Sequence, residues 1–323
     1  MTATNVISVV GATGSQGGGL VEAVLADPDR QFRVRALTRS VNSAAARELA
    51  AAGAEVIEAD LDDGASMCRA FDGAYGVFLV TNYWAELSAE DQARRTRAAR
   101  ELEQVDIAAL AAKQAGVSHV IWSTLEDTRE HFGADERVPT VDGRYKVPHF
   151  DAKAEADAVL REYDVPTTFL RTTLFFEGFT GALAPSRGDD GMLKLTLPIA
   201  DRAMSGIAVA DIGKTALQIF KRGSEFLGTT LSIAGDHLTG EQYAAVLSDA
   251  LGEPVIYQPL TWDEFRAQGF PGAVEMGNMF QYYAENSERF IGARDLERAR
   301  DLNPELQSFS DWAESHRNEF HNK

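Results

Sequence analysis

The sequence has little cysteine, few cations relative to its acids and no long apolar run. Its one cysteine, Cys68, excludes an intramolecular disulfide and a zinc site built on several thiolates. Lys and Arg total 31 against 49 Asp and Glu, which gives a formal net charge of -18. Because such a chain repels phosphate backbones, we do not expect direct nucleic-acid binding.

Two further absences bear on location and on metals. No apolar run approaches the roughly 20 residues that span a bilayer, and the N-terminus lacks the basic segment of a signal peptide. We therefore expect a cytoplasmic protein without membrane association. The six histidines show no metal-ligand spacing, so no metal site is expected.

Short apolar runs alternate with helical patterns along the first half of the chain. Alternation of this kind predicts right-handed βαβ units and a parallel sheet, and strands this apolar suit burial between two helix layers. The expected strands are 6–10, 32–38, 54–58, 76–80, 119–123 and 165–171. The expected helices are 18–25, 43–52, 64–71, 90–115 and 152–163. The predicted fold class is therefore α/β, a Rossmann-type doubly wound parallel sheet.

The pattern becomes irregular beyond about residue 125. Residues 126–148 are polar and predict a loop, and Asp211 is expected to cap a helix that runs towards Phe220. Further helices are expected at 240–251, 260–268 and 311–320. The predicted domains are a Rossmann domain over 1–150, joined by 151–171 and parts of 205–235, and a smaller α/β C-terminal lobe over 172–323.

A glycine-rich loop follows the first expected strand. Gly11, Gly14 and Gly17 form G-x-x-G-x-x-G between a strand and a helix. In a dinucleotide-binding loop, glycines at these places permit the tight turn, the approach to the pyrophosphate and close helix–strand packing. The helix N-terminus then offers unpaired N–H groups to the phosphates. An ordinary tight turn is the alternative, but the position at the first βα turn favours cofactor binding.

The end of the second strand bears on the choice between NAD and NADP. An acidic residue there would bond the adenosine ribose, but the chain reads Leu37-Thr38-Arg39-Ser40. Arg39 suits a 2′-phosphate, and the Thr38 hydroxyl can add a hydrogen bond. The alternative is a solvated surface arginine. We predict NADP(H) as the cofactor.

Polar residues also follow the third and fourth strands. Asp62, within the run Asp60 to Asp63, is expected to accept a hydrogen bond from the adenine amino group; a helix-capping cluster is the alternative. Thr81 and Asn82 are expected along the cofactor, because ligands bind at the carboxyl ends of parallel strands. A simple turn is the alternative there.

These residues resemble those of the NmrA-like family, in particular its HSCARG type, within the atypical short-chain dehydrogenase/reductases. The resemblance rests on the glycine loop, Thr81-Asn82-Tyr83-Trp84, His149-Phe150-Asp151-Ala152-Lys153 and Phe176-Glu177. It implies a Rossmann domain, a small C-terminal lobe and a cleft between them. The cofactor-binding residues so predicted are Gly11, Thr13, Gly14, Ser15, Gln16, Gly17, Thr38, Arg39, Asp62, Asp63, Thr81, Asn82, Tyr83, Lys153, Phe175, Phe176 and Glu177.

The catalytic residues depart from those of a typical short-chain dehydrogenase, which carries Tyr-x-x-x-Lys on a helix and a Ser on the preceding strand. Lys153 and Ser123 are present, but His149 stands where the tyrosine would be. His149 is either a proton donor or a polar neighbour of the cofactor. Lys153 is the alternative proton donor, as in isoflavone-reductase-like relatives. The Ser123 hydroxyl is either catalytic or a partner for a strand-end group.

Two functions stay open, because the family includes both cofactor-sensing transcriptional co-regulators and reductases. The first is an NADP(H)-binding redox sensor, with the 126–148 loop as its mobile element and a protein partner. The second is an NADPH-dependent reductase of a quinone, enone or other small carbonyl compound. The expected long helix over 90–115 suggests a homodimer. A DNA-bound repressor is disfavoured by the charge.

Overall fold

The structure is a computed structural model that describes residues 5–320. Its contacts divide the chain into two units. Unit 1 comprises residues up to 127, 149–171 and 212–231; unit 2 comprises 128–148, 172–211 and 232 onwards. Residues 128–148, which fall inside the Rossmann domain expected over 1–150, cluster with unit 2.

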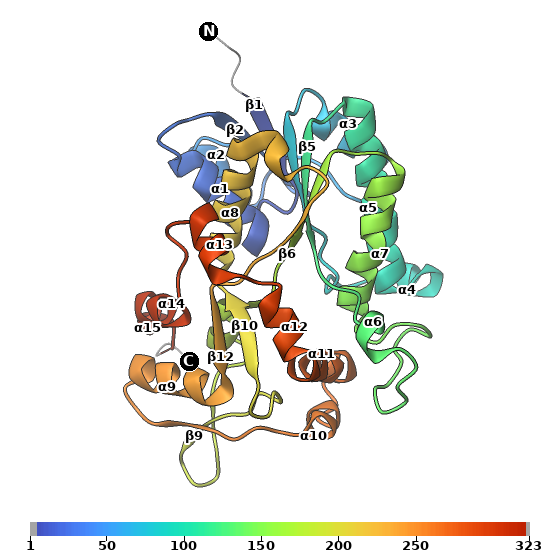
Figure 1. The fold of residues 1–323 in the computed structure, drawn as a ribbon. Helices are drawn as coiled ribbons and strands as arrows, with labels where there is room; N and C mark the ends of the chain where they lie inside the picture. Colours follow the sequence, from blue (N-terminus) through green and yellow to red (C-terminus); the bar gives the residue numbers. More distant parts are fainter. Residues whose placement is uncertain (1–4, 321–323) are drawn as a thin grey trace. The chain divides into compact units, whose positions relative to one another are not determined.

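A seven-stranded sheet organises unit 1 (Figure 1). Its order is β11-β6-β5-β4-β1-β2-β3, and the pairings from β6 to β3 are parallel. The strands are β1 (Asn5–Val9), β2 (Phe32–Thr38), β3 (Glu55–Glu58), β4 (Gly76–Leu79), β5 (His119–Thr124), β6 (Thr167–Arg171) and β11 (Thr230–Ser232). The order reverses between β1 and β4, which is where doubly wound sheets bind ligands. The predicted fold class is confirmed.

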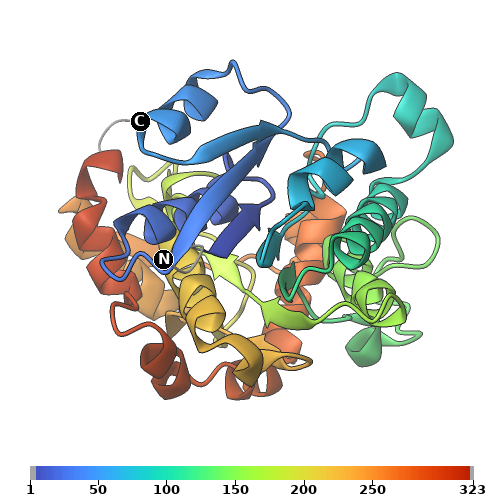
Figure 2. The same cartoon turned by 90° about the horizontal axis from the view of Figure 1, so that it is seen from above.

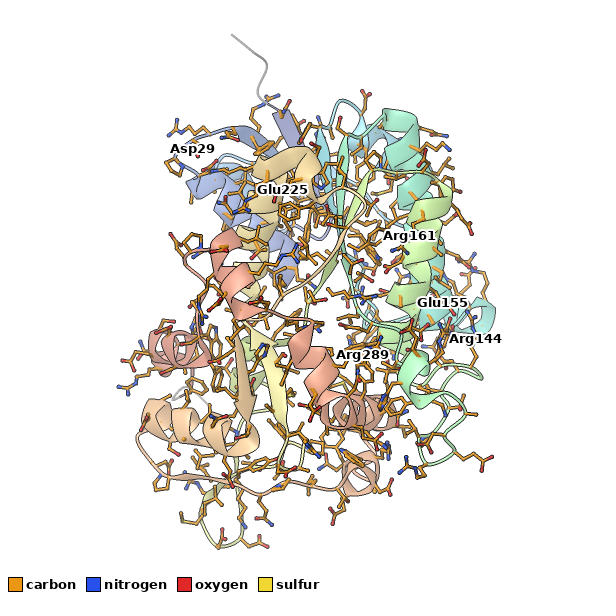
Figure 3. All side chains as sticks on the ribbon, in the orientation of Figure 1. Asp29, Arg144, Glu155, Arg161, Glu225 and Arg289 are labelled. Atoms are coloured by element: carbon orange, nitrogen blue, oxygen red, sulfur yellow. The ribbon has the colours of Figure 1, made fainter. Side chains whose placement is uncertain are left out.

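Helices cover both faces of this sheet (Figures 1 and 2). They are α1 (Ser15–Ala26), α2 (Ala44–Ala51), α3 (Gly64–Phe71), α5 (Arg97–Ala115), α7 (Pro148–Glu162) and α8 (Val209–Arg222). A short helix that buries no residue, α4 (Ala89–Arg94), precedes α5. Apolar side chains of α3, α5 and α7 form one buried core with β4 and β5. Arg161, labelled in Figure 3, lies near the end of α7. Its guanidinium carbon is 4.1 Å from the centroid of the Phe169 ring. A sheet buried on both faces accounts for the continuous apolar runs in the sequence.

The single long helix expected over 90–115 is wrong. Arg95 is extended, with φ -154° and ψ 153°, and separates α4 from α5. The Thr96 side chain accepts a hydrogen bond from the Ala99 N–H and so begins α5. At the other end, Gly116 takes the left-handed conformation that commonly stops a helix.

Unit 2 contains two small sheets and several short helices. One sheet has the order β12-β10-β7 and the other β13-β9-β8. The strands are β7 (Leu174–Phe175), β8 (Ser186–Arg187), β9 (Leu193–Leu195), β10 (Ala203–Ile207), β12 (Asp236–Thr239) and β13 (Val255–Tyr257). The helices are α6 (Arg129–Phe132), α9 (Gly240–Leu251), α10 (Trp262–Arg266), α11 (Ala273–Glu285), α12 (Ser287–Gly292), α13 (Leu296–Leu302), α14 (Phe309–Ser315) and α15 (Arg317–Phe320).

Three expectations for this part of the chain need correction. The loop expected over 126–148 contains α6, and the helix expected over 311–320 is two helices. Asp211 lies inside the first turn of α8, so it is not the residue before the helix that the prediction required. Its carboxylate accepts hydrogen bonds from Asn303 Nδ2 at 3.1 Å and from the Gln307 N–H at 2.9 Å. Within residues 5–320, no helix is both long and apolar enough to cross a membrane.

Candidate cofactor site

The glycine loop joins β1 to α1 in a conformation that depends on its glycines. Gly11 has φ +66°, where an L side chain is strained. A Cβ on Gly17 would lie 2.4 Å from the Gly11 carbonyl oxygen, so only glycine fits. Gly14 is the N-cap of α1, and no side chain caps this helix. Its first-turn N–H groups therefore remain available to an anion.

A cavity of about 260 Å³ lies beside this loop. It brings together six of the predicted residues, namely Gly11, Thr13, Gly14, Thr38, Arg39 and Asn82. Arg100 and Gln104 of α5 also line it, and the sequence reasoning missed both because it considered only strand ends. Their spacing of four on a helix, just after a Thr N-cap, is the signal that could have found them.

Arg39 lies exposed at the wall of this cavity, directly after β2. The neighbouring Thr38 is buried, and its Oγ1 accepts from the Ser40 N–H at 3.2 Å. Among residues 5–320, Arg39 has no ion-pair partner. The guanidinium is thus a cation at the cavity edge that no carboxylate of the described residues neutralises.

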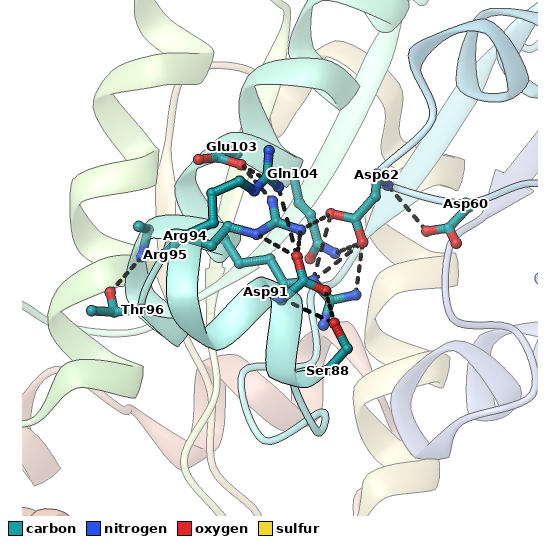
Figure 4. Close-up of polar contacts among 11 residues, drawn as sticks. Asp60, Asp62, Ser88, Asp91, Arg94, Arg95, Thr96, Glu103 and Gln104 are labelled. Carbon is teal, nitrogen blue, oxygen red and sulfur yellow. Dashed lines mark hydrogen bonds and ion pairs between the residues drawn. The ribbon is translucent and has the colours of Figure 1, made fainter.

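The Asp62 carboxylate is held by α5 and by the link that precedes it (Figure 4). It accepts from Arg100 Nη2 at 2.7 Å, Arg95 Nη2 at 3.0 Å and Gln104 Nε2 at 3.2 Å. Burial would raise the pKa of Asp62, but the hydrogen bond and charge of Arg100 outweigh it and lower that pKa. Asp62 as the adenine acceptor stays a prediction. Asp63 caps α3, accepting from the Ala65 N–H at 3.0 Å.

Lys153 lies buried on α7 and contacts two polar side chains. Its Nζ is 2.7 Å from Glu101 Oε1 and 2.6 Å from Thr81 Oγ1. The Thr81 hydroxyl also bonds Glu101 Oε1, and the Lys153 Nζ lies 4.9 Å from the centroid of the Trp122 ring. The structure thus brings the predicted Lys153 and Thr81 together. Glu101 was missed; a glutamate at core spacing on an Ala- and Val-rich helix face was the available signal.

A second buried carboxylate supports the Trp122 ring. Asp157 accepts from Trp122 Nε1 at 2.9 Å and from Thr124 Oγ1 at 2.7 Å. Burial raises the pKa of Asp157 to about 6, against an ordinary value of 3.8. Asp157 lies four residues after Lys153 on α7, so the ring that faces the ammonium is itself fixed from the same helix face.

His149 and Ser123 have different surroundings. The His149 ring, four residues before Lys153 on α7, packs against Tyr83 at 5.9 Å and Trp84 at 5.1 Å between centroids. The Ser123 hydroxyl donates to Gln16 Oε1 of the glycine loop at 2.7 Å. Both side chains therefore have partners within unit 1, and their catalytic roles stay predictions.

The predicted contacts after β6 belong to unit 2. Phe175 is half-buried in β7, whereas Phe176 is buried and packs against Phe309 at 5.0 Å between ring centroids. Glu177 Oε1 accepts from the Val209 N–H at 2.9 Å, and burial raises the pKa of Glu177. A part for these three residues in a cofactor site of unit 1 stays a prediction.

Comparison with known proteins assigns the family. The chain is 28% identical over 307 residues to the NmrA-like family domain-containing oxidoreductase lnaB of Aspergillus flavus, covering 90% of this chain and 87% of that relative. NmrA, a negative transcriptional regulator solved with NADP and with NAD, matches with a TM-score of 0.74 in both complexes, at 24% and 23% identity, over 96% of this chain and 94% of that chain. An NADPH-dependent quinone oxidoreductase from Escherichia coli matches with a TM-score of 0.69 at 23% identity, over 96% of this chain and 98% of that chain. The NmrA-like family model matches residues 3–314, and the chain belongs to the NmrA-like family.

Proposed function

We propose that unit 1 binds NADP(H) in the cavity beside the glycine loop. The observation that carries this proposal is that one cavity is lined both by Gly14, the N-cap of the uncapped helix α1, and by the exposed Arg39. The pyrophosphate would take the first-turn N–H groups of α1, and the 2′-phosphate would take the Arg39 fork. The NADP complex of NmrA supports the same cofactor class.

Of the two roles, we propose that of a cofactor-responsive regulatory protein. The three candidate catalytic side chains already have partners: Lys153 bonds Glu101 and Thr81, Ser123 bonds Gln16, and His149 packs among aromatic rings. No tyrosine stands at position 149. A sensor needs only different affinities for two cofactor states, which a site without a free proton donor can still supply.

The second candidate is an NADPH-dependent reductase of a quinone, enone or other small carbonyl compound. It is favoured by Lys153, which shares a face of α7 with His149, and by relatives named as oxidoreductases. In that reaction bound NADPH would supply a hydride to a carbon of the substrate, and the Lys153 ammonium would donate a proton to the oxygen on which negative charge develops.

Loss of NADPH absorbance with a panel of quinones, enones and aldehydes separates the two roles. NADPH binding is measured in parallel, on wild type and Lys153→Ala. Binding without turnover on the panel is the expected result. Turnover that vanishes in Lys153→Ala while NADPH still binds would establish the reductase and overturn the regulatory role.

The macromolecular partners of this proposal are a regulatory protein and a second copy of the chain. The dimer prediction now rests on α5 alone, because the expected helix over 90–115 is interrupted at Arg95. Light scattering on the purified protein measures its mass directly. A monomeric mass at micromolar concentration would contradict the dimer prediction.

A further inference from the structure

Glu101 is a buried carboxylate that enters unit 1 from α5. Its side chain is 1% exposed, and its Oε1 receives both the Lys153 ammonium and the Thr81 hydroxyl. Its second oxygen, Oε2, is buried and has no hydrogen-bond partner among residues 5–320. Glu101 thus binds Lys153 through Oε1, while Oε2 accepts no hydrogen bond from the described residues.

Stability is a poor explanation for this arrangement. Burying a carboxylate and an ammonium costs more free energy than burying a hydrophobic pair of similar size. The Oε2 atom, which is buried without a hydrogen bond, adds to that cost. Ala98, Val105 and Ala108 on the same helix are buried and apolar, so an apolar residue would fit the pattern. A buried charge pair with an unsatisfied atom is typical of a functional site.

The contacts define what Glu101 does to Lys153. The three N–H donors of the ammonium point to Glu101 Oε1, Thr81 Oγ1 and, at 3.4 Å, the Thr81 carbonyl oxygen. The Trp122 ring lies beside it. Thr81 lies two residues after the end of β4, and its neighbours Val80 and Asn82 both line the cofactor cavity. Glu101 therefore fixes the ammonium at the strand end next to the cavity wall.

We propose that Glu101 is a positioning residue, which holds Lys153 charged and oriented against Thr81 at the margin of the cofactor site. The expected effect of Glu101 on NADPH affinity rests on the proposed function. The pairing of Glu101 with Lys153 can be measured without any cofactor. Without the carboxylate, a buried ammonium has no counter-charge, so part of the Lys153 population becomes the neutral, nucleophilic amine.

Competitive labelling with trace acetic anhydride, read by mass spectrometry at single lysines, tests the pairing. Lys146 is the internal reference, because it is 7% exposed like Lys153 but donates to the backbone carbonyls of Asp135 and Val138. We expect the Lys153-to-Lys146 labelling ratio to rise about tenfold in Glu101→Gln at fixed pH. Glu101→Asp keeps the charge and should give a ratio between the two. An unchanged ratio in both variants would overturn the proposal.

NADPH affinity supplies the second measurement. Glu101→Gln should bind NADPH about tenfold more weakly, and Glu101→Asp should recover part of that loss. If wild type itself fails to bind NADPH, the proposed function fails while the labelling ratio still decides the pairing. Thermal unfolding shows whether each variant folds. If Glu101→Gln does not fold, the Lys153-to-Lys146 labelling ratio of Glu101→Asp decides. A ratio in Glu101→Asp equal to that of wild type then contradicts the proposal.

Discussion

Two regions of unit 1 handle polar groups in opposite ways. The glycine-loop cavity presents backbone N–H groups and the exposed Arg39, whose partners are left to solvent or a ligand. The buried lysine network, defined as Lys153, Glu101, Thr81, Trp122 and Asp157, pairs its polar side chains with one another, although Glu101 Oε2 has no partner among residues 5–320. The first region is built to gain free energy when a ligand arrives. The second keeps its geometry whether or not a ligand is present. Substitutions in the first region should therefore weaken cofactor binding, whereas substitutions in the second should lower the free energy of unfolding.

The largest effect should come from breaking the lysine network. Lys153→Met leaves the Glu101 carboxylate buried without a partner, which should lower the free energy of unfolding by about 3–5 kcal/mol. Urea denaturation measures this. The double variant Glu101→Met with Lys153→Met removes both charges and should recover most of the loss. A single variant as stable as wild type would show that the network contributes no internal pairing.

Gly17→Ala should distort the glycine loop that lines the cavity. The added Cβ would meet the Gly11 carbonyl oxygen at 2.4 Å, so the loop must move and NADPH affinity should fall by about 100-fold, close to 3 kcal/mol. Fluorescence titration with NADPH measures the affinity. Gly18→Ala is the matched control, because its Cβ would lie 3.4 Å from the Ala12 carbonyl oxygen. Equal losses in both variants would refute the close-approach argument.

Asp157→Asn tests the network through pH. Burial raises the pKa of Asp157 to about 6, so between 3.8 and about 6 the folded state holds a proton that the unfolded state has released. Wild-type stability relative to Asp157→Asn should therefore fall as pH rises across that window and level off above it, by about 2 kcal/mol between pH 4 and pH 7. Urea denaturation of both proteins near pH 4 and near pH 7 measures the change. A difference independent of pH would contradict the raised pKa.

Arg39→Gln should give the smallest effect, confined to one cofactor. Loss of the charged fork should weaken NADPH binding about tenfold, near 1.4 kcal/mol, and leave NADH unchanged. Arg33→Gln is the control, because Arg33 lies on β2 and is exposed, like Arg39, but does not line the cavity. Titration with NADPH and with NADH separates the two affinities. Equal weakening of both would contradict the assignment of Arg39 to the 2′-phosphate.

Local signals made the site-bearing part of the fold predictable. The β2 strand and the α3 helix have the bounds that the sequence predicts, because apolar alternation and the Asp63 cap act over a few residues. The loop glycines at 11 and 17 are needed for backbone reasons that are visible in the sequence. The helix expected over 152–163 instead begins at Pro148, where a missing N–H costs nothing, and this earlier start puts His149 and Lys153 on one helix.

What the sequence did not reveal depends on distant partners or on weak patterns. The pairing of Glu101 with Lys153 spans 52 positions and has no local signature. Thr96 caps α5, but its helix-favouring neighbours on both sides concealed the break at Arg95. Strands β7 and β8 have two residues each, too few to show any period.

Isothermal titration of the wild-type protein with NADPH and with NADH tests the central claim most directly. We expect NADPH to bind with a Kd at least about tenfold lower than that of NADH, because only NADPH carries the 2′-phosphate that Arg39 would receive. Equal affinities would contradict the assignment of Arg39, and absence of binding by both would contradict the cofactor site itself.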